Sequence, residues 1–257
     1  MSELVTEATA HKVVTSEAVF VTRQSLNSTS ALEVVELLSG SLLTIEVPGL
    51  HTLVLHAAVQ NTLLVGGLTD GHNVPALVAY SFAARQVLWI WDDLIPDTPP
   101  PDPDDIVDEA LPDLYSVAPS PDGVFLLLRL GYPTSAFFDT LITVDGKGVT
   151  RSLNARNALT SDLHDDGDRS YGWVNASTLL YVPPNGDAYT IDVATLSRSS
   201  ADLPELVGYD SAYGTGLPAV AVIVGENGLA VLDLAANTLT RVVAGPCAIQ
   251  VGPPERE

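Results

Sequence analysis

One stretch of the chain gathers the side chains that a cation site needs. Residues 161–173 have the sequence SDLHDDGDRSYGW, and the carboxylate oxygens of such a stretch are the ligands that Ca²⁺ prefers. The stretch does not complete a helix-loop-helix calcium motif, because its twelfth loop position holds Trp173 and not a glutamate. An acidic solvated loop is the favoured interpretation, and a looser metal site is the alternative. The metal-ligating candidates are Asp162, Asp165, Asp166 and Asp168.

The histidines and the single cysteine do not form a catalytic pattern. His51 and His56 are five residues apart on a strand-like stretch, so we expect their side chains on opposite faces, unable to share a zinc ion. Cys247 has no local basic group that would activate its thiol, and we expect it to be a small buried residue. No Gly-x-Ser-x-Gly nucleophile elbow occurs in the chain. The sequence therefore predicts no catalytic residue, no cofactor and a non-enzymatic protein.

A second acidic stretch favours an interaction with a protein partner. The segment 91–113 holds nine acidic residues, six prolines and no basic residue. Three consecutive prolines favour an extended, solvated backbone, so we expect this insertion to be exposed and to steer a basic protein surface. A connector without further role is the alternative. The candidate partner-binding residues are Asp97, Asp102, Asp104, Asp105, Asp108 and Glu109.

The charge of the whole chain limits its partners. The 32 acidic and 11 basic residues give a formal net charge of −21, which repels phosphate backbones and anionic lipids. Nucleic acid and membrane are therefore not expected as partners. The chain has no run long enough to span a membrane and no signal-peptide pattern, which predicts a cytoplasmic protein, or a virion component if the source is viral. The oligomeric state is left open.

The apolar segments recur along the chain in a five-fold pattern. Each unit has an apolar strand, then a more alternating strand, then a short one, and no segment has the pattern of an amphipathic helix. Five units of three to four antiparallel strands predict an all-β fold, a single β-propeller over residues 1–257 closed by its terminal strands. A sixth blade is left open. The apolar strands begin at Ala18, Thr62, Val124, Thr178 and Ala219.

The third apolar strand follows a turn that resembles a turn of a known family of proteins. The sequence VAPSPDGVFLLL, residues 117–128, resembles the Ser-Pro-Asp-Gly turn between the first two blade strands of WD40-like and TolB-type β-propellers. The family usually has an aromatic residue before the serine, where this chain has Pro119, and its Trp-Asp signature occurs once, at Trp91. The resemblance implies a fold and no function. Because five apolar residues follow the turn, we expect Val124–Leu128 to be almost wholly buried between two sheets.

These observations favour an interaction role. The predicted function is a protein-protein interaction or scaffold subunit of a larger assembly, because a propeller is a rigid disc with many loops. One alternative is a decoration or tail-associated structural protein of a virus from a salt-adapted host. Another is a propeller glycosidase or lactonase, since propeller glycosidases carry paired carboxylates in their central funnel.

The acidic surface generates a prediction about salt. Aspartate outnumbers glutamate by 21 to 11 and only two lysines occur, which is typical of proteins from salt-rich interiors; codon bias is the alternative. Salt screens repulsion between crowded carboxylates over about 8–10 Å near physiological concentration. We expect the melting temperature to rise from low to molar salt, in chloride and in sulfate alike. A flat or falling melting temperature would favour codon bias.

Overall fold

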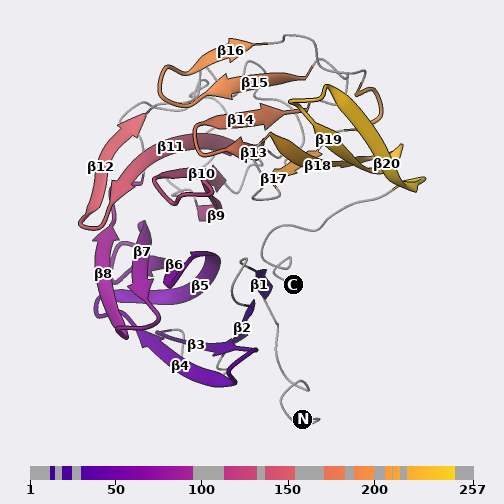
Figure 1. The fold of residues 1–257 in the computed structure, drawn as a ribbon. Coiled ribbons are helices and arrows are strands. Elements are labelled where there is room, and N and C mark those ends of the chain that lie inside the picture. Colours follow the sequence, from indigo (N-terminus) through magenta and orange to yellow (C-terminus); the bar gives the residue numbers. More distant parts are fainter. Residues whose placement is uncertain are drawn as a thin grey trace.

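The protein is built from antiparallel β-sheets. The computed structural model describes residues 12–14, 19–24, 30–94, 113–131, 137–153, 171–182, 188–199, 206–209, 211–214 and 219–246. Within these ranges the regular elements are twenty strands in five four-stranded sheets, with no helix. A search of the same residues for a helix long and apolar enough to cross a membrane finds none. The five sheets follow one another along an arc (Figure 1).

Each sheet is a meander of four strands that are consecutive in the chain, and we number the sheets I to V. Sheet I holds β1 (Lys12–Val14), β2 (Val19–Gln24), β3 (Ala31–Glu36) and β4 (Ser41–Glu46). Sheet II holds β5 (Leu50–Val59), β6 (Thr62–Thr69), β7 (Pro75–Ser81) and β8 (Gln86–Trp91). Sheet III holds β9 (Asp113–Pro119), β10 (Phe125–Gly131), β11 (Phe137–Asp145) and β12 (Gly148–Leu153). Sheet IV holds β13 (Tyr171–Asn175), β14 (Thr178–Tyr181), β15 (Tyr189–Asp192) and β16 (Ser197–Ser199). Sheet V holds β17 (Ser211–Gly214), β18 (Val220–Gly225), β19 (Gly228–Asp233) and β20 (Thr238–Ala244).

The five-fold strand pattern expected from the sequence is confirmed. The five apolar segments are the second strands of the five sheets, β2, β6, β10, β14 and β18. The segments expected after them are the third and fourth strands in every sheet. This all-β arrangement of five antiparallel sheets is compatible with a β-propeller. In the described residues β1 and β20 lie in different sheets, so the expected closure by the terminal strands is not observed there.

The core lies between neighbouring sheets. Four clusters of buried apolar side chains join sheets I and II, II and III, III and IV, and IV and V. Strand β10 contributes to two of them, because Leu126 and Leu128 face sheet II whereas Leu127 faces sheet IV. Successive side chains of a strand point to opposite faces, so a strand covered on both sides must be apolar at every position. This packing explains the uninterrupted apolar run of β10.

A closed set of hydrogen bonds builds the turn before β10. The Ser120 hydroxyl donates to Asp122 Oδ1 at 2.6 Å and accepts from the Phe125 N–H at 3.0 Å, and Ser120 is 1% exposed. The Gly123 N–H donates to the Ser120 carbonyl at 2.9 Å. Gly123 has a φ of 74°, and a Cβ there would lie 2.8 Å from Val59 Cγ1 of sheet II. The turn therefore fixes the start of β10 and also packs against the neighbouring sheet.

The prediction that Val124–Leu128 is almost wholly buried is wrong at its first two positions. Leu126, Leu127 and Leu128 are at most 6% exposed, but Val124 is 40% exposed and Phe125 is half-buried. The reason is that Val124 still belongs to the turn, where its N–H donates to Asp122 Oδ1 at 3.1 Å. The strand begins one residue later.

The ends of the acidic insertion belong to the folded sheets. Trp91 is the last residue of β8 and Asp113 is the first residue of β9. Leu94 is 1% exposed and packs in the cluster between sheets II and III. The expectation that the whole segment 91–113 is exposed is therefore wrong at Leu94, because an apolar side chain next to the β8 terminus reaches the core. Residues 95–112 lie outside the described residues.

We predict that Ser120→Ala destabilises the protein by about 1–3 kcal/mol, because the half-buried Phe125 N–H and the Asp122 carboxylate lose the buried Ser120 hydroxyl as their partner. The matched control is Ser39→Ala, whose hydroxyl bonds Ser41 Oγ on an exposed turn and whose loss should cost less than about 0.5 kcal/mol. Denaturant unfolding of the two variants measures the difference. Equal stability losses would contradict a structural role for this turn.

Candidate functional site

The two groups of acidic candidates from the sequence lie outside the described residues. This applies to the four aspartates at 162–168, to the six carboxylates at 97–109 and to Cys247. The described residues next to these stretches include Asp113, where β9 begins, and Leu153, where β12 ends. β9 and β12 are the two opposite edge strands of sheet III, so the described residues do not bring the two stretches together.

The two histidines on β5 do not follow simple alternation. The register of β5 shifts between His51 and Val54 and again between Leu55 and Ala57. The prediction that His51 and His56 lie on opposite faces assumed regular alternation along β5. The two register shifts interrupt that alternation twice. The ring of His51 bonds the Leu68 carbonyl through Nδ1 at 2.8 Å. Across the part of the chain that the structure describes, no group of three or more His, Cys, Asp or Glu side chains could hold a metal ion.

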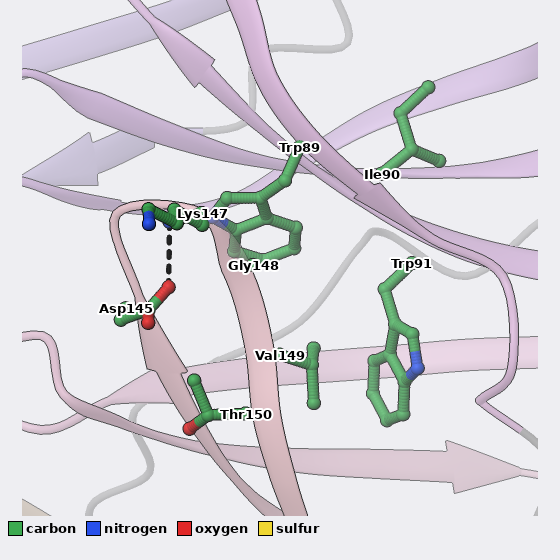
Figure 2. Close-up of a pocket in the computed structure, with 8 residues that line it drawn as sticks. All are labelled: Trp89, Ile90, Trp91, Asp145, Lys147, Gly148, Val149 and Thr150. Carbon is green, nitrogen blue, oxygen red and sulfur yellow. Dashed lines mark hydrogen bonds between the residues drawn. The ribbon is translucent and has the colours of Figure 1, made fainter.

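A hollow of about 380 Å³ lies between sheets II and III and is the candidate site. One wall is β8 and the other is the hairpin of β11 and β12 (Figure 2). In Figure 2 the rings of Trp89 and Trp91 and the side chain of Val149 point into the space between the walls, whereas Ile90 points away. The lining residues are Trp89, Ile90, Trp91, Asp145, Lys147, Gly148, Val149 and Thr150.

Strand geometry explains why both tryptophans face the hollow. Trp89 and Trp91 are opposite Ala79 and Leu77 of β7, two positions apart on one face of the strand. Both rings are half-buried and pack against the cluster between sheets II and III. On the opposite wall, a Cβ at Gly148 would lie 3.5 Å from Trp89 Cβ, so the glycine lets the hairpin approach the ring closely. The rings are thereby held at the rim of the core with one side open.

Two polar groups of the hairpin are already engaged within it. Asp145 Oδ1 accepts the Lys147 N–H at 2.7 Å, drawn in Figure 2, and the Thr150 hydroxyl donates to the Thr143 carbonyl at 3.0 Å. These bonds shape the turn and fix the backbone of Lys147. The Lys147 ammonium makes no ion pair with a described residue. The hollow therefore combines aromatic surface with one basic side chain, Lys147, and one acidic side chain, Asp145.

Sequence reasoning missed this site. Its two walls come from different sheets, so no local pattern brings β8 and the β11–β12 hairpin together. Trp91 was noted only as part of a Trp-Asp dipeptide. The available signal was the segment VLWIW at 87–91, where two tryptophans alternate on a strand that has no charged residue. Such a strand is unusual at a sheet edge.

A buried ion pair is the second chemical feature, and it lies between sheets III and IV. Arg129 and Asp139 are directly opposite on β10 and β11, and their side chains are 12% and 3% exposed. Arg129 Nε and Nη2 donate to the two Asp139 oxygens at 2.9 and 3.1 Å. Burial disfavours the charged guanidinium, but the Asp139 charge outweighs this effect and raises the pKa of Arg129. The Arg129 guanidinium therefore stays charged although it is buried.

One tyrosine of sheet IV, Tyr171, interacts with this pair and belongs to a row of three tyrosines. Burial, and after it the negative charge of Asp139, raise the pKa of Tyr171, so its phenol stays neutral. Tyr171 stacks on Tyr181 with ring centroids 4.9 Å apart, and Tyr181 lies at the same distance from Tyr189. A neutral phenol beside a satisfied ion pair offers neither a nucleophile nor a base. We interpret the group as structural, joining sheet III to sheet IV.

No known family model matches this sequence, and no curated protein is similar enough to it to count as a relative.

We predict that Asp139→Asn lowers the free energy of unfolding by about 3–5 kcal/mol, because Arg129 would remain charged and buried without its counter-ion. The control is the double variant Arg129→Leu with Asp139→Leu, which removes both charges and should recover most of the loss. Thermal unfolding of the three proteins measures this. An Asn variant as stable as the native protein would contradict a buried, coupled pair.

Proposed function

We propose that the protein is a five-bladed β-propeller that acts as a protein-interaction or scaffold subunit of a larger assembly, and that it docks a partner at strand β8. Three findings support the propeller. Five meanders of equal strand number succeed one another in the chain, each packs face to face on the next through a buried cluster, and the sheets follow an arc (Figure 1). Radial repetition of four-stranded sheets is the propeller architecture.

The exposure of β8 carries the interaction proposal. β8 lies at the edge of sheet II, and its residues 87–91 are all apolar. Leu88 and Ile90 are 38% and 47% exposed. A register shift leaves Leu88 without an opposite residue on β7. Free edges with exposed apolar side chains attract other chains, and native proteins usually protect them with charge or proline.

The other last strands show that protection. β4 carries Glu46, β12 carries Arg151, β16 carries Arg198 and β20 carries Arg241. Among the five last strands that the structure describes, β8 is the one without a charged residue. In a chain of net charge −21, an apolar edge strand without any charged residue supports the proposal that a partner covers this surface.

We predict that the double variant Leu88→Lys with Ile90→Lys releases the protein from its native complex while leaving its melting temperature nearly unchanged, because both side chains are already half exposed. The control is Leu38→Lys, at a residue of the β3–β4 turn in sheet I that is 76% exposed. Size-exclusion chromatography of the complex, isolated from the native source with each tagged variant, measures association. Unchanged association of the double variant would overturn docking at β8.

The same assay tests the acidic insertion as a partner-binding arm. A short Gly/Ser linker in place of residues 97–108 removes five of the six candidate carboxylates. Unchanged melting with weaker association, most of all at low salt, would support the arm. Intact association would make the segment a connector, and unfolding would make it structural.

A further inference from the structure

The hollow at β8 presents two aromatic rings from one face of one strand. Trp89 and Trp91 are half-buried, and their rings point into the space between the walls (Figure 2). The face of an aromatic ring is electron-rich, so it attracts a cation that lies within about 6 Å of the ring centre, and tryptophan does so most strongly. The hollow therefore has a surface that suits a cationic group.

The molecule uses such a contact at another sheet. In sheet IV the guanidinium of Arg198, on the last strand β16, lies 4.9 Å from the centre of the Tyr189 ring on β15. In sheet II the last strand, β8, carries the rings itself and has no basic residue. A contact that sheet IV makes internally is therefore one that β8 can make with another molecule.

The charges around the hollow favour a cation. Asp145 lines the hollow and uses Oδ1 to accept the Lys147 N–H at 2.7 Å, so its other oxygen, Oδ2, can accept from a ligand. Asp92 and Asp93 are exposed and follow Trp91 directly in the chain. Lys147 is the one basic residue of the lining, and the three carboxylates outweigh it. The net charge of −21 adds a long-range attraction for cations.

Among cationic side chains the lining favours arginine. A guanidinium is planar and stacks flat on an indole, and it is more weakly hydrated than the ammonium of lysine. This matters here because Trp89, Trp91 and Val149 replace little of a hydration shell. The N–H groups at the rim of a stacked guanidinium can still donate to Asp145 Oδ2. The volume of about 380 Å³ is at the small end of the range of ligand sites, about 300–1,000 Å³, which suits one long side chain.

We propose that the hollow between β8 and the β11–β12 hairpin receives an arginine side chain of the partner protein, with its guanidinium against Trp89 and Trp91 and an N–H donated to Asp145. This inference rests on the proposed function and names the chemistry of its partner. The exposed Leu88 and Ile90 supply the apolar part of the same surface. The matching partner surface is therefore apolar with an arginine beside it.

The test uses the full chain and synthetic peptides. The probe is acetyl-SVRVS-amide, compared with peptides in which lysine, glutamate or citrulline replaces the arginine; citrulline keeps the shape of arginine without its charge. Each peptide is titrated to millimolar concentration at physiological salt, which screens general attraction to the acidic surface, while tryptophan fluorescence is recorded.

We expect saturable binding of the arginine peptide, about three- to tenfold tighter than that of the lysine peptide, and no saturable binding of the other two. Equal binding of the lysine or the citrulline peptide would overturn the proposal. The absence of binding by the arginine peptide would overturn it as well.

Two variants localise the binding. Trp91→Leu keeps apolar packing on the core while removing the ring, and we expect it to weaken binding about three- to tenfold. Asp145→Asn keeps Oδ1 for the Lys147 N–H and removes the charge, which should weaken binding by up to about fivefold, as for one exposed ion pair. The matched control is Asp233→Asn, because Asp233 ends β19 as Asp145 ends β11 and accepts the Ala236 N–H with Oδ1 at 2.9 Å. Equal effects of the two asparagine variants would show a general charge effect and overturn the proposed contact.

Lys147 provides a test of the opposite sign. Its ammonium repels an arginine in the hollow, so Lys147→Gln should strengthen binding of the arginine peptide by up to about fivefold. The control Arg241→Gln removes an exposed cation of β20, with the same change in net charge, and should leave binding unchanged. Weaker binding by the Lys147→Gln variant would overturn the proposal.

The peptide assay and the native complex separate the two proposals. If the arginine peptide fails to bind but the Leu88→Lys, Ile90→Lys variant still releases the native partner, the interaction role stands and the arginine contact is wrong. If the peptide binds with the expected selectivity but native association survives that variant, the hollow is an arginine site and the docking surface at β8 is wrong.

Discussion

The fold depends on one constraint, which is that each internal sheet must be covered on both faces. The second strands satisfy it by being apolar at nearly every position, so that Leu126 and Leu128 enter one cluster and Leu127 the next. Burial of large apolar side chains contributes about 1.5–3 kcal/mol each, and this term outweighs the cost of ordering loops between sheets. Polar side chains between the sheets are paired with one another. Arg129 and Asp139, for example, form a buried ion pair next to Tyr171.

The same constraint decides what the sequence could predict. A strand covered on both faces leaves a local signal, a short run of consecutive apolar residues, and the second strands were all found by it. The Ser120 turn was found as well, since its conformation is set by residues in contact along the chain. First strands were not identified as a set, because β1 has three residues and β17 four, too few to show a period. Val124 was misplaced by one position for a related reason, because composition does not distinguish the last residue of a turn from the first residue of a strand.

The candidate site could not be predicted in this way, because it is formed between sheets. Trp89 and Trp91 are visible in the sequence, but their value as a surface depends on the hairpin that carries Gly148 and Val149, more than fifty residues later in the chain. The acidic stretches were the more conspicuous candidates in the sequence, since charge and proline content are read locally. The described residues that flank them, Asp113 and Leu153, belong to opposite edge strands of sheet III, so the described residues do not bring the two stretches together.

The unprotected edge of β8 is best understood against the charge of the chain. An acidic surface repels other copies of the same chain, so an apolar strand can stay exposed without general aggregation. Lys147 is one of only two lysines in the chain, and it lines the hollow together with Trp89, Trp91 and Asp145. The net charge of −21 would attract basic segments and repel acidic ones, and the Asp145 carboxylate in the hollow acts in the same direction. The carboxylates at 97–109 would add to this effect, so a partner that covers β8 would carry a basic patch next to its apolar contact surface.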